Sequence, residues 1–473
     1  MARPNVLLVV LDSVRAQNVS HLGYPRGTTP EIDAFADRAT TYRNARAPGI
    51  HSMASHVSLF TGYQVAEHRA TSHSVTLEPG HTIWEDLSGL NYRTGLFTPN
   101  SIVADASNLA SFFDHVVGPK RRELLFPDAM GPTDLPGDPS YTEYVRNALT
   151  SETPIRGILN GLDRAFGSAS ALPDPERERG AVYVDEFLEW QSEGEGPWAA
   201  CLNLMDAHFP YVPQPEYDRW GSDRLRQLHE EATGGPLKTQ YLGDRPFWEL
   251  EAFEHLYDGC VRQADAYVGQ LLTELERRGL LEDTLVVITS DHGEGFGERS
   301  VLNDAVRLID HSWGIDDELA HVPLIVKYPE QSTPETVRAP ATLARFPTVV
   351  RAAIDGDRAD FIPSDGRALT TTYRVEEPGE GLPPSRAELA PYFGPWHAVC
   401  HDTEAGIRVD AIRRDDQVRT APSAGRGCTV DGEADRALVE SVVEAIEPVD
   451  VTGETATMDD AVEQRLQELG YMT

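Results

Sequence analysis

Lysine is almost absent from this chain. Its 473 residues include only Lys120, Lys238 and Lys327, so arginine supplies nearly all of the positive charge. Acidic residues number 76 against 41 basic ones, which gives a formal net charge of −35 at pH 7. A surface this acidic repels polyanions, and we expect no nucleic-acid partner. An acidic chain poor in lysine is also typical of organisms with a high-salt cytoplasm, and we expect that setting here.

Cysteines are few, and long apolar runs are missing. The chain enters an apolar run at its N-terminus without the segments of a signal peptide, so the expected location is the cytoplasm. No run approaches the length that crosses a bilayer, and no membrane span is predicted. We expect buried free thiols and no disulfide framework, because no metal-ligand or disulfide spacing joins Cys201, Cys260, Cys400 and Cys428.

Two aspartates, far apart in the sequence, each follow a short apolar run. Asp12 comes directly after Val6–Leu11, and Asp291 and His292 follow Thr284–Thr289. Short runs rich in β-branched residues are typical of buried strands in a parallel sheet. Because ligands bind beyond the carboxyl ends of such strands, Asp12, Asp291 and His292 could share one cation. For either aspartate alone, capping of the next turn is an equally good interpretation.

A candidate nucleophile lies between these two strands. Pro48 and Gly49 indicate a loop, and the residues from Ser52 onward have the spacing of a short helix that Gly62 would end. Ser52 would then lie at the helix N-terminus, where unpaired N–H groups and the helix dipole stabilise an oxyanion. A lone serine in this place would usually be a plain N-cap.

The ordered set of motifs resembles a known family. Asp12 after the first run, the stretch Ser52–Gly62, the segment Ser290–Glu294 and the run Val322–Ile325 match the order and spacing of the sulfatase family of the alkaline phosphatase superfamily. The resemblance covers roughly the first 330 residues. The final stretch Leu466–Tyr471 is also similar to the tail of many such chains, so the sequence is identified as that of a sulfatase-like hydrolase.

The resemblance implies an α/β fold, an alkaline-phosphatase-like α/β/α sandwich with a mostly parallel central sheet and a smaller C-terminal α+β subdomain. The length allows one large domain with such an appendage. We place the catalytic domain at residues 1–330, with an insertion or lid at 118–175 that is rich in proline, glycine and aspartate. Residues 331–473 would form the subdomain, with antiparallel strands near 369–375 and 406–412 and closing helices near 436–446 and 459–469.

The family also implies one divalent metal ion held by Asp12, Asp291 and His292, with the oxygen of Ser52 as a further ligand. In ordinary sulfatases the Ser52 position is a cysteine, within Cys-x-Pro-Ser-Arg, that is oxidised to formylglycine. This chain reads Ser-Met-Ala-Ser-His from Ser52 to His56, so an unmodified serine is the simpler interpretation. That chemistry resembles the phosphatase, phosphodiesterase and phosphotransferase branches. His292, where many sulfatases have asparagine, favours manganese or zinc over calcium or magnesium.

Further site candidates come from other strand ends and loops. His208 follows the apolar run 199–205, and His311 lies near the place of a lysine that the family carries. Either histidine would protonate the leaving alkoxide or bind the anionic oxygens. Weaker candidates for substrate binding are His56, Asn100 and Asp206. A structural role is expected for His321, and surface positions are expected for His68 and His73.

These parts favour a metal-dependent enzyme that hydrolyses sulfate or phosphate esters, of a small molecule or a glycan, through a covalent intermediate on Ser52. Three alternatives stay open. A two-metal phosphomutase or phosphatase would hold a second ion with Asp206, His208 and His311. A phosphotransferase or phosphodiester transferase would use another alcohol in place of water, and a non-catalytic sulfatase-fold protein would only bind. The sequence carries no signature of the oligomeric state.

Overall fold

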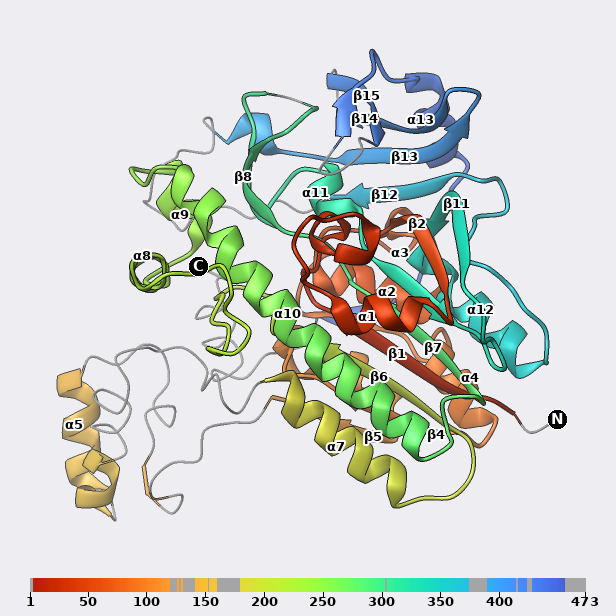
Figure 1. Cartoon of the computed structure of the whole chain (residues 1–473). Coiled ribbons are helices and arrows are strands. Elements are labelled where there is room, and N and C mark those ends of the chain that lie inside the picture. The colour runs from red at the N-terminus through yellow and green to blue at the C-terminus, as the bar shows by residue number, and fades with distance from the viewer. Residues whose placement is uncertain are drawn as a thin grey trace.

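An eight-stranded sheet forms the centre of the molecule in the computed structural model (Figure 1). Its strand order is β11-β2-β10-β7-β1-β6-β4-β5. Neighbouring strands are parallel, except that β10 is antiparallel to both β2 and β7. In this order the strands span Glu335–Thr342, Thr40–Arg46, Leu324–Lys327, Thr284–Thr289, Asn5–Leu11, Trp198–Leu204, Arg93–Phe97 and His115–Val117.

The structure describes residues 3–119, 126, 129–130, 141–151, 153–159, 179–302, 304–373, 389–413, 416–422 and 428–455. Most of the expected insertion at 118–175 therefore lies outside the described residues, although helix α5 (Tyr141–Thr150) within it is described. The helix expected near 459–469 lies entirely outside them. No helix among the described residues is long and apolar enough to cross a membrane.

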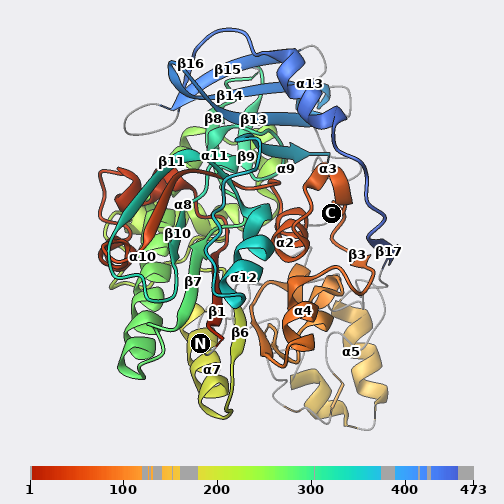
Figure 2. The ribbon, with the colours of Figure 1, turned by 90° about the vertical axis from the view of Figure 1, so that its right-hand side faces the viewer.

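Helices cover both faces of the large sheet. Leu7, Val9 and Leu11 of β1 point to one face and pack against α1, α7 and α10, whereas the residues between them point to α2, α4 and α12. In Figure 1 the long helix α10 lies across one face, and Figure 2 shows α12 and α2 on the opposite side. The six helices span Pro30–Ala36, Gly180–Ser192, Trp248–Arg277, Ser52–Thr61, Ile83–Gly89 and Phe346–Ile354. The expected α/β/α sandwich is confirmed.

A second, antiparallel sheet follows in the C-terminal part, with the order β12-β13-β14-β15-β16. Leu369, Val399 and Ile412 of this sheet form a small apolar cluster with Val439 of helix α13. The subdomain sheet lies at the top of Figure 1, next to β2 and α11. Its strands and helix span Ala368–Thr372, Trp396–Thr403, Gly406–Arg413, Asp416–Pro422, Cys428–Val430 and Arg436–Glu444.

Shorter elements connect these layers. Strand β17 pairs with β3, which ties the end of the described chain to the segment that follows α2. The remaining elements used below or shown in Figure 1 are α3 (Val65–His68), β3 (Val75–Leu77), α8 (Asp223–Ala232), α9 (Leu237–Leu242), β8 (Gly295–Arg299), β9 (Arg307–Asp310), α11 (Asp317–Ala320) and β17 (Thr452–Thr455).

Two features of the sheet differ from what the sequence suggests. Strand β10 runs antiparallel to β7, so His321, which precedes it, lies at the same sheet edge as the residue that follows β7. Strand β11 pairs with β2, so the large sheet continues past residue 330 and the smaller sheet begins only with β12.

The surface positions expected for His68 and His73 are wrong. Both residues are buried, and Nε2 of His68 lies 3.0 Å from Oγ of Ser58.

Candidate active site

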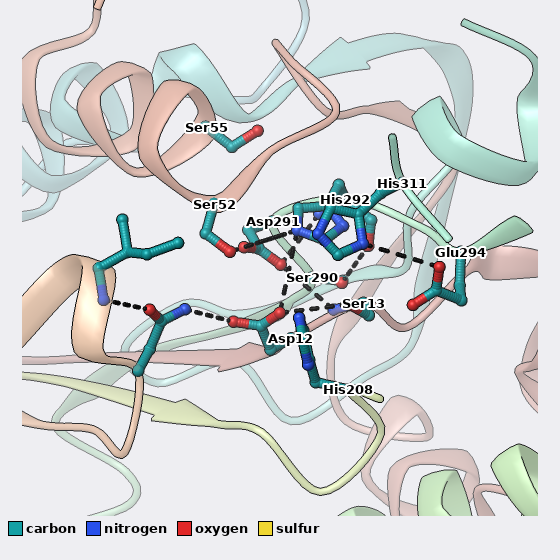
Figure 3. Close-up of polar contacts among 12 residues, drawn as sticks. Asp12, Ser13, Ser52, Ser55, His208, Ser290, Asp291, His292, Glu294 and His311 are labelled. Carbon is teal, nitrogen blue, oxygen red and sulfur yellow. Dashed lines mark hydrogen bonds and ion pairs between the residues drawn. The ribbon is translucent and has the colours of Figure 1, made fainter. Parts of the chain in front are cut away.

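The expected metal ligands meet at one edge of the large sheet. Asp12 follows β1 directly, and Asp291 and His292 follow β7 after one serine. Because β1 and β7 are parallel neighbours, their carboxyl ends lie side by side. All three side chains are fully buried. Each offers a ligand atom, and these atoms lie within 4.8 Å of one another (Figure 3).

One oxygen of Asp291 has no hydrogen-bond partner although it is buried. Oδ1 accepts the backbone N–H groups of Ser13 at 3.3 Å and His292 at 3.0 Å. Oδ2 accepts no hydrogen bond and lies 3.4 Å from Nε2 of His292. A buried carboxylate oxygen without a donor is costly, so its position indicates a place for a cation.

Hydrogen bonds orient the other two ligands toward the same point. Oδ2 of Asp12 accepts the side-chain amides of Asn100 at 2.9 Å and Asn203 at 3.3 Å, whereas Oδ1 lies 3.9 Å from Nε2 of His292. Nδ1 of His292 lies 2.9 Å from the carbonyl oxygen of Gly293. Because a carbonyl only accepts, Nδ1 carries the proton and the lone pair of Nε2 faces the carboxylates. This donor set fits a divalent metal ion.

Electrostatics in the cluster agree with that assignment. Burial lowers the pKa of His292, which keeps the imidazole neutral and able to ligate. For Asp12, burial alone would raise the pKa, but His208, His292 and His56 together outweigh it and lower the pKa. Asp12 is therefore an anion at neutral pH.

Ser52 is the first residue of α2, as predicted, with His51 as its N-cap. The helix ends at Gly62, whose φ of 86° lies in the left-handed region that favours glycine. Its apolar side holds it against the sheet through Val57 and Phe60. Oγ of Ser52 lies 3.3 Å from Nε2 of His292 (Figure 3), so the hydroxyl belongs to the same cluster as the three ligands.

His56 lies one turn further along α2 and is fully buried. Its Nδ1 donates to the carbonyl oxygen of Ser52 at 2.8 Å, and its Nε2 accepts the amide of Asn203 at 3.2 Å. Nδ1 also lies 3.7 Å from Oδ2 of Asp291. His56 therefore links the nucleophile helix to the ligands instead of facing a substrate directly. Asn100 likewise contacts Asp12, and its Oδ1 accepts the backbone N–H groups of Ile102 and Val103.

His208 and His311 both lie at this site. The ring centroid of His311 is 4.3 Å from that of His292, 5.4 Å from that of His208 and 5.9 Å from that of His51. Nδ1 of His208 donates to the carbonyl oxygen of Phe209 at 2.7 Å. The two histidines come from different loops, after β6 and after β9, and Figure 3 shows His311 beside His292 and His208 beside Asp12.

Two acidic residues flank His311. Oδ1 of Asp310 lies 2.6 Å from Nδ1 of His311, and Oε1 of Glu294 lies 3.7 Å from it. Burial would lower the pKa of His311, but Asp310 and Glu294 outweigh it and raise the pKa well above its usual value. Burial also raises the pKa of Glu294 to about 8. Asp310 has a φ of 57°, which is uncommon outside glycine and indicates that the surrounding structure fixes its direction.

Asp206 does not join the site, and the expectation that it binds substrate or a second ion is corrected here. Its Oδ2 accepts the backbone N–H of Gly180 at 3.0 Å, and its Oδ1 accepts the amide of Gln263 at 2.7 Å. It therefore faces α7 and α10, where burial raises its pKa to about 6. A second group with metal-ligand geometry does exist, formed by Glu294, Asp310 and His311, but the short Asp310–His311 contact already satisfies its closest pair.

Asn203 is a site residue that sequence reasoning missed, as are Asp310 and Glu294 beside His311. Asn203 lies on β6, one residue before the end of the strand, and pairs in register with Val10 of β1. Its position is therefore beside Asp12. Its side chain is buried and bridges Asp12 and His56. The available signal was a single amide within the otherwise apolar run 199–205. A polar group in a buried strand needs partners, and near the carboxyl end those partners belong to the site.

The sulfatase family model matches residues 4–355, which is well over half of the chain. The chain belongs to the sulfatase family. The expected family, and with it the class of ester hydrolase, is confirmed. The matched segment includes every site residue described above and ends after α12, before the C-terminal sheet begins.

Two relatives illustrate the distance within the family. The multifunctional alkaline phosphatase superfamily protein PehA of Trinickia caryophylli is 23% identical over 370 residues, which cover 69% of this chain and 68% of that protein. The ulvan-active sulfatase of Formosa agariphila is 24% identical over 345 residues, or 72% of this chain and 59% of the relative. The chain thus spans less than two thirds of the second relative's length.

Solved structures show the same fold. The phosphonate monoester hydrolase SpPMH of Silicibacter pomeroyi has a TM-score of 0.57 and 18% identity, with 93% of each chain covered. The phosphonate monoester hydrolase of Agrobacterium radiobacter has a TM-score of 0.54 and 17% identity, with 93% of this chain and 91% of that chain covered. At this level of identity the similarity concerns the fold alone.

Proposed function

We propose that this sulfatase-family chain is a metal-dependent hydrolase that cleaves sulfate or phosphate esters with a single negative charge, and that the unmodified hydroxyl of Ser52 is its nucleophile. The observation that carries the proposal is the position of Oγ of Ser52. It lies at the first residue of a buried helix, 3.3 Å from Nε2 of His292, in the cluster that contains the unpartnered oxygen of Asp291.

Asp12, Asp291, His292 and Ser52 are the residues that would hold the ion. A bound divalent ion supplies a Lewis acid there, which lowers the pKa of the serine hydroxyl and offsets the charge of the ester oxygens. Two carboxylates, one imidazole and one hydroxyl suit zinc or manganese better than calcium or magnesium, which prefer shells made of oxygen ligands. We therefore propose zinc or manganese.

The chain's own residues account for the bond changes. Ser52 reacts as the alkoxide, its proton having passed to solvent, and its Oγ bonds to the sulfur or phosphorus atom opposite the leaving oxygen while the ester bond breaks. Asp310 holds Nδ1 of His311, so Nε2 can give its proton to the leaving alkoxide. Water then attacks the sulfur or phosphorus atom bonded to Ser52 and returns a proton to His311. The alkoxide of Ser52 is restored, and the product released is sulfate from a sulfate monoester, a phosphate monoester from a phosphodiester, or a phosphonate from a phosphonate monoester. His208 would bind the anionic oxygens of the substrate.

The charge of the site favours substrates with one negative charge. In the part of the chain that the structure describes, no lysine or arginine contacts any of the four proposed ligands. The buried arginine Arg15 is paired with Glu254 and Glu298, and Arg46 is paired with Asp317. One divalent ion balances the two aspartates, which leaves little positive charge for a doubly charged phosphate monoester. Sulfate monoesters, phosphodiesters and phosphonate monoesters carry one charge each.

The surroundings of Ser52 support a serine that stays unmodified. His56 occupies the position of the arginine in the maturation motif, and both of its ring nitrogens are already used within the site. An arginine side chain would not fit between Ser52 and Asn203 without displacing these contacts, since all three residues are buried. A cytoplasmic setting at high salt is part of the same proposal and follows from the acidic, lysine-poor composition.

The test is the substitution Ser52→Ala, with Ser58→Ala as the matched control. Ser58 lies on the same helix, is buried, and contacts His68 of α3 and none of the proposed ligands. We expect Ser52→Ala to lower kcat for every ester by about 10⁴-fold or more, because a covalent step is lost. Ser58→Ala should keep near-normal kcat. Turnover by Ser52→Ala at the control's rate would refute the proposal.

A further inference from the structure

The segment from residue 46 to residue 51 joins β2 to α2 and fixes where Ser52 lies. Its carbonyl oxygens are held one after another. That of Ala47 accepts Oγ1 of Thr370 at 2.7 Å, and that of Pro48 accepts the backbone N–H of Thr371 at 2.9 Å. The carbonyl oxygen of Gly49 accepts a hydrogen bond from Oγ of Ser55, a residue of α2, at 3.2 Å. The first two donors belong to β12, the edge strand of the C-terminal sheet, more than 300 residues away in the sequence.

The same segment is tightly enclosed on its other sides. The backbone N–H of Ala47 donates to the carbonyl oxygen of Ala320 at 2.9 Å, which ties it to α11. A Cβ atom on Gly49 would lie only 3.1 Å from the Cβ of Ala54. Thr370 is 1% exposed and Ala47 is fully buried, so water cannot replace the hydrogen bond between them. The segment therefore has one position that satisfies its buried carbonyl groups.

We propose that Thr370 is a positioning residue for Ser52. The C-terminal sheet would then help to fix the position of the nucleophile. This inference rests on the nucleophilic role proposed above for Ser52. Without the hydroxyl of Thr370, the carbonyl of Ala47 is left buried and unpaired, and the segment must shift to find another donor. Ser52 follows five residues later and moves with it. A displacement of about 1 Å at a reacting atom lowers a rate by as much as about 100-fold.

The role of Thr370 also explains why the catalytic sheet and the smaller sheet contact each other at this point. Thr371, the next residue, is held in turn by the smaller sheet, because its Oγ1 lies 3.1 Å from Nδ1 of His397 on β13. His397 of β13 thus contacts β12, and β12 in turn contacts the segment from residue 46 to residue 51. A sheet that served only to complete the fold would not need to direct a side-chain hydroxyl at the carbonyl beside Pro48.

The test compares Thr370→Val, Thr370→Ser and the control Thr284→Val. Thr284 is also a buried threonine whose Oγ1 donates to a carbonyl oxygen at 2.7 Å, that of Leu280, but it lies at the start of β7, the far end of the sheet from the site. We expect Thr370→Val to lower kcat by about 10- to 100-fold with little change in KM and in bound metal. Thr370→Ser, which keeps the hydroxyl, should stay within about threefold of wild type. Thr284→Val should lose a similar amount of thermal stability and keep its kcat.

The outcomes separate this inference from the proposed function. If Ser52→Ala is inactive but Thr370→Val has the kcat of Thr284→Val, the positioning role is refuted and the proposed function stands. If Ser52→Ala keeps its activity, the proposed function fails first. Should Thr370→Val not fold, Thr370→Ala is measured against Thr370→Ser in its place. Equal kcat values for the alanine and serine variants would then overturn the inference.

Discussion

Asp291→Asn offers a sharp test of the metal site because it should change stability in opposite directions with and without metal. The ligand atoms of Asp12 and Asp291 lie within 4.8 Å of one another. At an effective dielectric constant near 20, two negative charges at that separation repel each other by about 3 kcal/mol. The amide keeps an oxygen for the N–H groups of Ser13 and His292 and removes the charge. Part of the repulsion is lost to structural relaxation and to screening, so we expect the metal-free variant to gain about 1–2 kcal/mol of stability.

With metal the order should reverse. An ion at about 1,000 times its dissociation constant stabilises the wild-type protein by about 4 kcal/mol. The variant places an N–H group where the ion would bind, so its free energy of unfolding should not change when metal is added. Chemical denaturation with and without zinc or manganese, combined with metal analysis of the purified proteins, measures both effects.

Asp206→Asn is the matched control for this experiment. Asp206 is a partly buried aspartate close in sequence to His208, but its oxygens accept hydrogen bonds from Gly180 and Gln263. Its variant should respond to metal like the wild-type protein. The metal assignment is refuted if Asp291→Asn binds the ion with wild-type affinity, or if it is less stable than the wild type in the absence of metal by more than about 1 kcal/mol.

Three further predictions concern the leaving group, pH and salt. His311→Gln should slow the hydrolysis of alkyl esters at least tenfold more than that of 4-nitrophenyl esters, because only a poor leaving group needs a proton, and equal losses across a leaving-group series would contradict this role. Burial lowers the pKa of His229 to about 3, so between pH 6.5 and that value the unfolded chain binds a proton that the folded chain does not, and stability falls as the pH falls. Urea denaturation at pH 6.5 and pH 5 should show about 2 kcal/mol less loss for His229→Gln than for the wild type, and an unchanged loss would refute the assignment. Finally, removal of molar salt should unfold the chain, because the Debye length grows from about 3 Å at 1 M to about 30 Å at 0.01 M and the net charge of −35 is then unscreened; an unchanged Tm would exclude the high-salt argument.

The principal ligands could be predicted from the sequence because two simple regularities apply to them. Asp12 and Asp291 follow buried runs that form adjacent parallel strands, and such strands present their carboxyl ends at one edge. Ser52 could be placed because Pro48 and Gly62 bound a short helix whose residues are buried throughout. In each case a local pattern is enough to place the residue at the site, although the final orientation of Asp12 depends on Asn100 and Asn203.

The errors arose where orientation depends on a distant partner. Asp206 follows a buried strand as Asp12 does, but its side chain accepts a hydrogen bond from the backbone of Gly180 at the start of α7. The sequence does not show that the start of α7 lies next to Asp206. The direction of β10 is not encoded in its sequence, because three apolar residues and one lysine are compatible with a strand that runs either way. Strand β11 contains Pro340 and a bulge, which an edge strand tolerates. Its sequence therefore lacks the continuous apolar run that indicates a buried strand.

The contribution of the C-terminal sheet could not be predicted for a similar reason. The sequence indicates alternating strands after residue 368, and two of these strands are confirmed close to their expected bounds. Nothing in the threonines of β12 shows that one of them reaches the loop before Ser52. That contact exists only because the two sheets meet at the end of β2, which is a property of the tertiary structure.

The most direct test of the central claim is the mass of the peptide that contains Ser52, measured in the resting enzyme and in enzyme quenched during turnover of a phosphodiester or sulfate ester. The account predicts the mass of an unmodified serine at rest, and a phosphoryl or sulfuryl adduct located on Ser52 in part of the quenched sample. An aldehyde at Ser52 in the resting enzyme, with turnover of sulfate esters alone, would contradict the account and place this chain with the formylglycine-dependent sulfatases.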